Sequence, residues 1–165
     1  MQLYENGFLK FADATQIGSL KSDLIDSFDI YSEDNNKFVQ VDAEELAEFS
    51  FEFFMANLNK ILEKRKFFLD VKAANDHELS HKVLINDSIV QLYTKEELEK
   101  EDFWDTAPRN FFKEVNRQLQ MSQIDESFYL LYGGNDLCVL LLTEHEQKII
   151  AEKYADDIKA VPYLP

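Results

Sequence analysis

The chain of 165 residues has little cysteine, glycine or proline: one, four and three residues, respectively. A single cysteine, Cys138, permits no disulfide bond within the chain, so the fold does not depend on an oxidising compartment. The few glycines and prolines form no linker, and no internal repeat or low-complexity tract divides the sequence. We therefore expect residues 1–165 to form one domain, because this length suits a single full hydrophobic core.

Long apolar segments are also absent. No run reaches the roughly 18 apolar residues that a membrane-spanning helix requires. The segment Met1 to Phe11 lacks a basic stretch followed by an apolar run, so we expect no signal peptide. Cys138 lies in the apolar run Leu137–Leu142, a setting typical of a buried cysteine and not of a nucleophile. These features predict a cytoplasmic protein.

Basic residues are scarce relative to acidic ones. The chain has 17 Lys and Arg residues and 32 Asp and Glu residues, which gives a formal net charge of −15. This charge repels nucleic acid and anionic membranes and attracts basic partners, although an acidic balance also serves simply to keep a protein in solution. Hydrophobic residues make up 45% of the chain, which supplies a core and excludes a disordered protein.

The clearest structural pattern is a β-hairpin in the last third of the chain. Two apolar runs, Ser127–Tyr132 and Leu137–Leu142, flank the turn residues Gly133 to Asp136. Neither run alternates apolar and polar residues, so we predict mid-sheet strands that are buried on both faces. Thr143 and Glu146 then form the pattern of a capping box at the start of a helix.

Apolar spacing predicts further helices. A first amphipathic helix is expected near Thr15–Ser27, and a long one over Asp42–Lys64 with Asp42 as its N-cap. The alternation at Phe49–Phe53 would also fit an exposed strand, but no turn residue interrupts the long run, which favours a helix. Thr94 begins a second capping box with Glu97. A helix near Pro108 has a buried stripe of Phe111, Phe112, Val115 and Leu119.

Further strands are expected in short apolar runs bounded by polar turns. The predicted elements are a strand, turn and strand over Leu3–Phe11, a hairpin of Phe28–Tyr31 with Phe38–Val41, a strand at Lys66–Val71, and a hairpin of Val83–Ile85 with Ile89–Tyr93. Hairpins mixed with helices, without regular β-α-β alternation, indicate an α+β fold. We expect a largely antiparallel sheet built from hairpins, with several packed helices.

One short motif points to chemistry. The sequence His77-Glu78-Leu79-Ser80-His81 matches His-Glu-x-x-His, and residues four apart on a helix share a face, so His77 and His81 could hold one zinc ion. In these five residues the chain resembles the zincin metallopeptidases. The resemblance implies His77 and His81 as zinc ligands and Glu78 as the general base for a zinc-bound water.

A catalytic zinc also needs a third protein ligand, for which the sequence offers only His145 or one of many carboxylates. The alternative, which we prefer, is a polar connection between two strands that happens to contain two histidines. The basic cluster Lys64-Arg65-Lys66 is expected to be the solvated end of the long helix, where cations offset the helix dipole.

The acidic segment around Trp104 is the best candidate contact surface. Glu101, Asp102 and Asp105 surround this tryptophan, and an exposed Trp within acidic charge suits a basic protein partner. In the alternative, which we favour, Phe103 and Trp104 point inward and fix a helix end to the core.

These observations predict a non-catalytic acidic binding protein that needs no cofactor and binds a basic protein partner, not nucleic acid or membrane. Immunity proteins, bacterial inhibitors that neutralise a basic toxin, have this general profile, which is an analogy of class only. The alternative is a zinc-dependent hydrolase that uses His77, Glu78 and His81.

Overall fold

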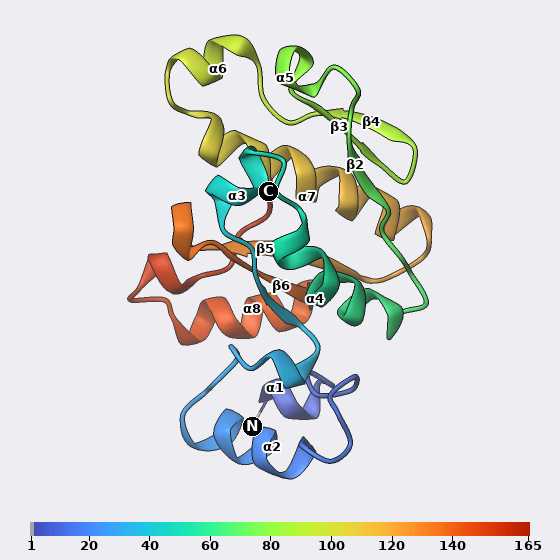
Figure 1. Ribbon diagram of the computed structural model, residues 1–165. Helices are drawn as coiled ribbons and strands as arrows, with labels where there is room; N and C mark the ends of the chain where they lie inside the picture. Colours follow the sequence, from blue (N-terminus) through green and yellow to red (C-terminus); the bar gives the residue numbers. More distant parts are fainter. Residues whose placement is uncertain (1) are drawn as a thin grey trace.

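The computed structural model describes residues 2–165 and confirms the α+β class (Figure 1). Its elements form two separate three-stranded antiparallel sheets, where we predicted one, and a set of helices packed around them. No helix in the described residues is long and apolar enough to cross a bilayer. The helices are α1 (Gln2–Glu5), α2 (Ile17–Asp26), α3 (Ala43–Ala47), α4 (Glu52–Glu63), α5 (His77–Ser80), α6 (Lys95–Glu99), α7 (Phe103–Met121) and α8 (Glu144–Lys153).

The first sheet has the order β1-β6-β5, with strands β1 (Phe38–Gln40), β5 (Glu126–Leu131) and β6 (Cys138–Thr143). The predicted hairpin is confirmed, since β5 and β6 pair antiparallel over their whole length. Strand β6 is central, as expected, whereas β5 lies at the edge and gains only a single bridge between Leu130 and Tyr163. The turn between them uses positive φ angles at Tyr132 (62°) and Gly134 (60°).

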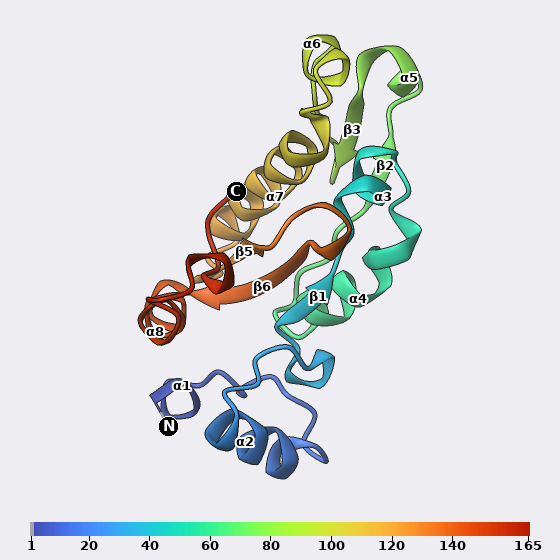
Figure 2. The same ribbon diagram turned by 90° about the vertical axis from the view of Figure 1, so that its left-hand side faces the viewer.

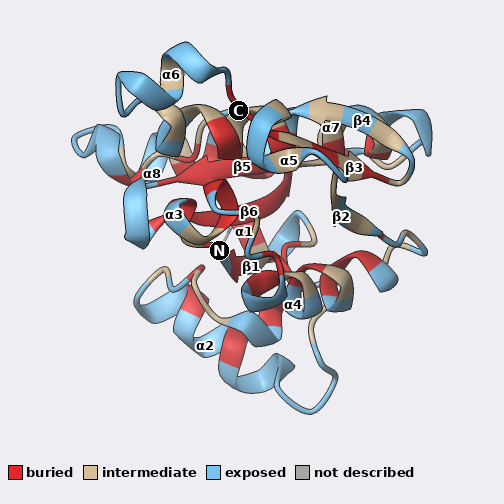
Figure 3. Ribbon diagram, turned by 45° about the horizontal axis from the view of Figure 1, so that its top comes forward, coloured by how far each residue is buried: buried red, intermediate tan, exposed pale blue. Residues whose placement is uncertain are grey.

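Both faces of this sheet are buried, which explains its unbroken apolar sequence. Alternate residues of β5 and β6 face opposite cores: Phe128 and Leu141 join the larger one, and Tyr129 and Leu140 the smaller one. The larger core includes side chains of α3, α4 and α7, and the smaller one side chains of α1, α2 and α8. Figure 3 shows β5 and β6 as continuous buried ribbons, and Figure 2 shows α1 and α2 at the end of the molecule remote from α6.

The second sheet has the order β2-β3-β4, with strands β2 (Val71–Ala73), β3 (Lys82–Ile85) and β4 (Ser88–Gln91). The predicted hairpin around Asn86 and Asp87 is confirmed, and both turn residues have positive φ, 46° and 66°. Strand β2 covers Val71–Ala73, so the strand predicted over Lys66–Val71 is wrong at every residue but Val71. Both predicted capping boxes are present, at Thr94 with Glu97 and at Thr143 with Glu146.

Three predicted strands in the N-terminal part are wrong. The segment Leu3–Phe11 contains the short helix α1 followed by turns. Residues Phe28–Tyr31 form no strand, because β1 pairs instead with β6, about a hundred residues further along the chain. Helix α2, by contrast, matches the predicted helix near Thr15–Ser27.

The predicted long helix over Asp42–Lys64 is in fact two helices, α3 and α4. Asp42 is the N-cap as predicted, since its carboxylate accepts hydrogen bonds from the backbone N–H groups of Glu44 and Glu45. The break occurs at Phe49, whose φ of 63° is left-handed, while the N–H of Ser50 donates to the carbonyl of Glu45. Aromatic packing of the Phe49 ring against Phe51, His77 and Tyr93 accompanies this conformation at a position that usually favours glycine.

Candidate functional site

The His77–His81 motif lies on a helix of only four residues, α5. His77 opens the helix, and its Nδ1 lies 3.0 Å from the carbonyl oxygen of Ala74. His81 follows the helix with a left-handed φ of 51°, so it does not continue the helical face on which His77 lies. Glu78 is exposed to solvent.

The two imidazoles pack in an aromatic cluster. The His77 ring lies 5.0 Å from the Phe49 ring, and the His81 ring stacks on Tyr93 at 4.6 Å. In residues 2–165, no group of three or more His, Cys, Asp or Glu side chains is arranged to hold a metal ion. The residues present therefore do not supply the ligand set of a zincin, and the zinc hypothesis stays a prediction without a third ligand.

The predicted acidic segment lies at one pocket of about 290 Å³. Glu101, Asp102, Trp104 and Asp105 all line it, together with Ala43, Pro108, Leu130, Gly133, Gly134, Leu137 and Tyr163. We call this site the acidic pocket. Of the described residues that line it, three are carboxylates and none is Lys, Arg or His.

The two neighbouring aromatic residues of this segment have different roles. The Phe103 ring is half-buried and lies 5.1 Å from the Tyr93 ring, so it points inward as we favoured. Trp104 is 39% exposed and lines the acidic pocket, so the inward orientation that we favoured for it is wrong. Tryptophan is among the residue types most enriched at binding hot spots.

Charge pairing at the acidic pocket is partial. Asp105 forms an ion pair with Arg109 one helical turn later, with its Oδ2 2.7 Å from Nε and its Oδ1 3.1 Å from Nη2. The Arg109 guanidinium also lies 5.0 Å above the Tyr163 ring, and the hydrogen bond to Asp105 raises the Arg109 pKa. Glu101 and Asp102 form no ion pair with any residue in 2–165, so two carboxylates remain available to a ligand.

The other half of this pocket is not apparent from the sequence. Tyr163, Leu130 and the Gly133-Gly134 turn come from the C-terminal part of the chain, and the bridge between Leu130 and Tyr163 brings the last residues beside β5. The turn residues were predicted, but no local pattern places them opposite Trp104.

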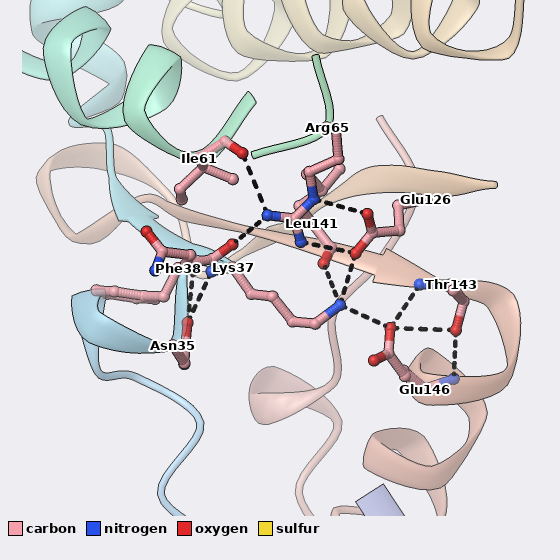
Figure 4. Close-up of polar contacts among 10 residues, drawn as sticks. Asn35, Lys37, Phe38, Ile61, Arg65, Glu126, Leu141, Thr143 and Glu146 are labelled. Atoms are coloured by element: carbon pink, nitrogen blue, oxygen red, sulfur yellow. Dashed lines mark hydrogen bonds and ion pairs between the residues drawn. The ribbon is translucent and has the colours of Figure 1, made fainter. Parts of the chain in front are cut away.

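A second cavity, of about 370 Å³, has the opposite character. Five cationic side chains line it, and we call it the basic cavity: Lys10, Lys37, Lys64, Arg65 and Lys66. Its deep part is a buried charge network (Figure 4). Lys37 Nζ donates to Glu126 Oε1 (2.7 Å), to Glu146 Oε2 (3.0 Å) and to the Leu141 carbonyl (3.2 Å).

Arg65 completes this network from the end of α4. Its Nε and Nη2 donate to the two oxygens of Glu126 at 2.7 and 2.8 Å, and Nη1 donates to the backbone carbonyls of Asn36 and Ile61. Only 2% of the Arg65 side chain is exposed, so the prediction that this residue belongs to a solvated helix end is wrong. Burial raises the pKa of Glu126, but the hydrogen bond from Arg65 and the charge of Lys37 outweigh it and hold the pKa below its usual range.

Cys138 is buried in the first sheet, as predicted. Burial raises the pKa of its thiol to about 12, so almost no thiolate exists at neutral pH. Its burial and its raised pKa are both typical of a structural cysteine.

Comparisons of the chain with protein-family models, with curated proteins and with solved structures give no match. The geometry of the two cavities is therefore the basis for assigning a function.

Proposed function

We propose that this chain is a non-catalytic, acidic binding protein that docks a basic protein partner on the acidic pocket and so neutralises it, as an inhibitor of a basic toxin would. The observation that carries the proposal is the convergence of Glu101, Asp102, Trp104 and Asp105 on one pocket. A cytoplasmic location is part of the proposal, since the fold uses no disulfide bond.

The net charge of −15 supports fast, steered association with a basic partner. A field of one sign raises the association rate at low salt, and the gain disappears when salt screens it. The negative potential should be strongest at the acidic pocket, because its described lining contains carboxylates and no cation.

The anchor of such a partner would be an arginine side chain. Guanidinium groups pair with carboxylates and stack on aromatic faces. The chain itself provides a precedent at this site, since Arg109 is held between the Asp105 carboxylate and the Tyr163 ring. Trp104 with Asp102 and Glu101 offers a second arginine the same two kinds of contact.

The proposal is tested by affinity capture with a matched pair of variants. We expect Asp102→Asn/Trp104→Ala to lose about 2 kcal/mol of binding free energy, a roughly 30-fold loss, because a central tryptophan anchor typically contributes this much. The control Glu99→Gln/Met121→Ala also removes one negative charge and one exposed apolar side chain, but at residues that do not line the acidic pocket. It should retain full affinity.

The captured protein should be basic, and its association rate should fall steeply as salt is raised. Equal capture by wild type and both variants, or an association rate independent of salt, would overturn the proposal. Titration with N-acetyl-arginine amide provides a direct check, since the indole N–H resonance of Trp104 should shift in wild type but not in Asp102→Asn.

A further inference from the structure

The basic cavity concentrates positive charge in a protein that is otherwise strongly negative. Five of the 17 Lys and Arg residues line this one cavity. The acidic residues in its lining are Asp125, Glu126 and Glu146, so the described lining carries two more positive than negative charges. The chain as a whole carries −15.

The excess positive charge lies at the rim of the cavity. In the deep part, Lys37 and Arg65 are matched by Glu126 and Glu146 through short ion pairs, so that part is close to neutral. Every N–H of the Lys37 ammonium and of the Arg65 Nε has a protein acceptor, and both side chains are only 2% exposed. The N–H groups of this network are therefore already paired within the protein, so any ligand of the cavity would be bound by other residues.

The rim contains three exposed lysines, Lys10, Lys64 and Lys66, opposed in the lining by the single exposed carboxylate of Asp125. None of the three lysines forms an ion pair with a residue in 2–165. Lys10 comes from the turn after α1, and its Nζ lies 5.0 Å above the Phe11 ring, on which the Arg65 guanidinium also lies at 4.0 Å.

The position of Lys66 is not explained by the helix dipole alone. Lys64 caps the end of α4, where a cation offsets the dipole. Lys66 lies beyond the helix in a left-handed conformation with φ of 60°, which costs a non-glycine residue roughly 1–2 kcal/mol. The chain therefore has a charged side chain at a position that glycine would occupy more stably.

We propose that the basic cavity binds a small phosphate-bearing molecule. Lysine ammonium groups are effective point-charge ligands for phosphate, and a concave site focuses their field. The Gln123 amide also lines the cavity and supplies a neutral hydrogen-bond donor. Its volume of about 370 Å³ falls in the range of small-molecule sites, while the net charge of the chain disfavours a long polyanion such as nucleic acid.

The test is calorimetric titration of the full chain with inorganic pyrophosphate at low ionic strength. We expect wild type to bind and Lys64→Ala/Lys66→Ala to bind at least about tenfold more weakly, since two charge-assisted contacts are lost. The control Lys95→Ala/Lys148→Ala removes the same charge from exposed pairs on α6 and α8, and should bind within about twofold of wild type.

Lys66→Gly separates binding from folding. Glycine adopts the left-handed conformation of residue 66 at lower cost than lysine, so the melting temperature should stay the same or rise. The affinity for pyrophosphate should fall about fivefold, because one lysine is lost from the rim. No heat of binding in wild type at about 10 mM pyrophosphate, or an equal loss in the α6/α8 control, would overturn the proposal. Failure of this site would leave the acidic pocket untouched, because the two cavities share no lining residue.

Discussion

The acidic pocket and the basic cavity use charge in opposite ways. In the acidic pocket the carboxylates of Glu101 and Asp102 are exposed and form no ion pair within the described residues. In the basic cavity the deep charges of Lys37 and Glu126 are buried and paired at 2.7 Å, and only the rim lysines are exposed. Exposed charges contribute little to folding but remain available to a ligand, whereas buried pairs are costly to break.

The comparison predicts that substitutions in the two sites separate stability from binding. A change deep in the basic cavity should weaken the fold, whereas a change at the rim of either site should weaken binding without weakening the fold. Three predictions test this separation, and they are given in order from the largest expected effect to the smallest.

The largest effect is expected from Lys37→Met. This substitution leaves Glu146 without its cationic partner and removes one of two cations from Glu126, at sites that are 2% and 5% exposed. Breaking a buried pair from one side typically costs about 3–5 kcal/mol, which urea unfolding at pH 7 should detect. The control Lys10→Met, at the exposed rim of the same cavity, should change the free energy of unfolding by no more than about 0.5 kcal/mol. Equal losses for the two variants would break the distinction between the deep part and the rim.

A smaller, pH-dependent effect is expected at Glu126. Although burial raises its pKa, Arg65 and Lys37 lower it further, so the folded pKa lies below that of the unfolded chain, which is about 4.3. The stability contributed by the ionised carboxylate is therefore fully present above about pH 4.3 and is lost as the pH falls through the folded value.

The urea midpoint of wild type should consequently fall between pH 5 and pH 3 by more than that of Glu126→Gln, which has no carboxylate to protonate at this position. The exposed substitution Glu99→Gln should keep the pH profile of wild type. Parallel profiles for wild type and Glu126→Gln would show that this carboxylate does not carry the acid sensitivity.

The two sites differ, for a physical reason, in how far they can be predicted from the sequence. Glu101, Asp102, Trp104 and Asp105 lie within five consecutive residues, so their grouping is visible in the sequence. The lining of the basic cavity includes Lys10, Lys64–Lys66 and Glu126. These residues are far apart in the sequence and become neighbours only when the chain folds. Arg65 was assigned to solvent because its local pattern is that of a helix end, and only the tertiary position of Glu126 buries it.

A helix end without glycine explains the error in the predicted long helix Asp42–Lys64. With four glycines in the chain, helices end at non-glycine residues in the left-handed region, at Phe49, Lys66, Glu101 and Gln123. In each case the next N–H donates to the carbonyl five residues earlier, as in a Schellman motif. Glycine is the usual sequence signal for a residue that ends a helix in the left-handed conformation. Phe49 does not give this signal, so the end of α3 cannot be recognised from the sequence. The hairpins β3–β4 and β5–β6 and both capping boxes, which depend on adjacent residues, were predicted correctly. The predicted hairpin of Phe28–Tyr31 with Phe38–Val41 was wrong, because β1 pairs with the distant strand β6.

The smallest effect, and the sharpest comparison between the two sites, is expected from a matched pair of glycine substitutions. Glu101 in the acidic pocket and Gln123 in the basic cavity both end a helix in the left-handed region, with φ of 61° and 60°. Relief of this backbone cost, offset in part by the greater freedom of glycine in the unfolded chain, should make Glu101→Gly and Gln123→Gly each more stable by about 0.5–1 kcal/mol.

The two variants should differ in what they bind. Glu101→Gly removes an unpaired carboxylate and should weaken capture of a basic partner without altering pyrophosphate affinity, whereas Gln123→Gly should do the reverse. Urea unfolding measures the shared gain in stability, and the two titrations measure the opposite losses in binding. If glycine destabilised both variants, the side chains of Glu101 and Gln123 would be holding the helix ends in place. If each variant kept both affinities, these residues would belong to neither binding site, and the contrast between the two cavities would concern packing alone.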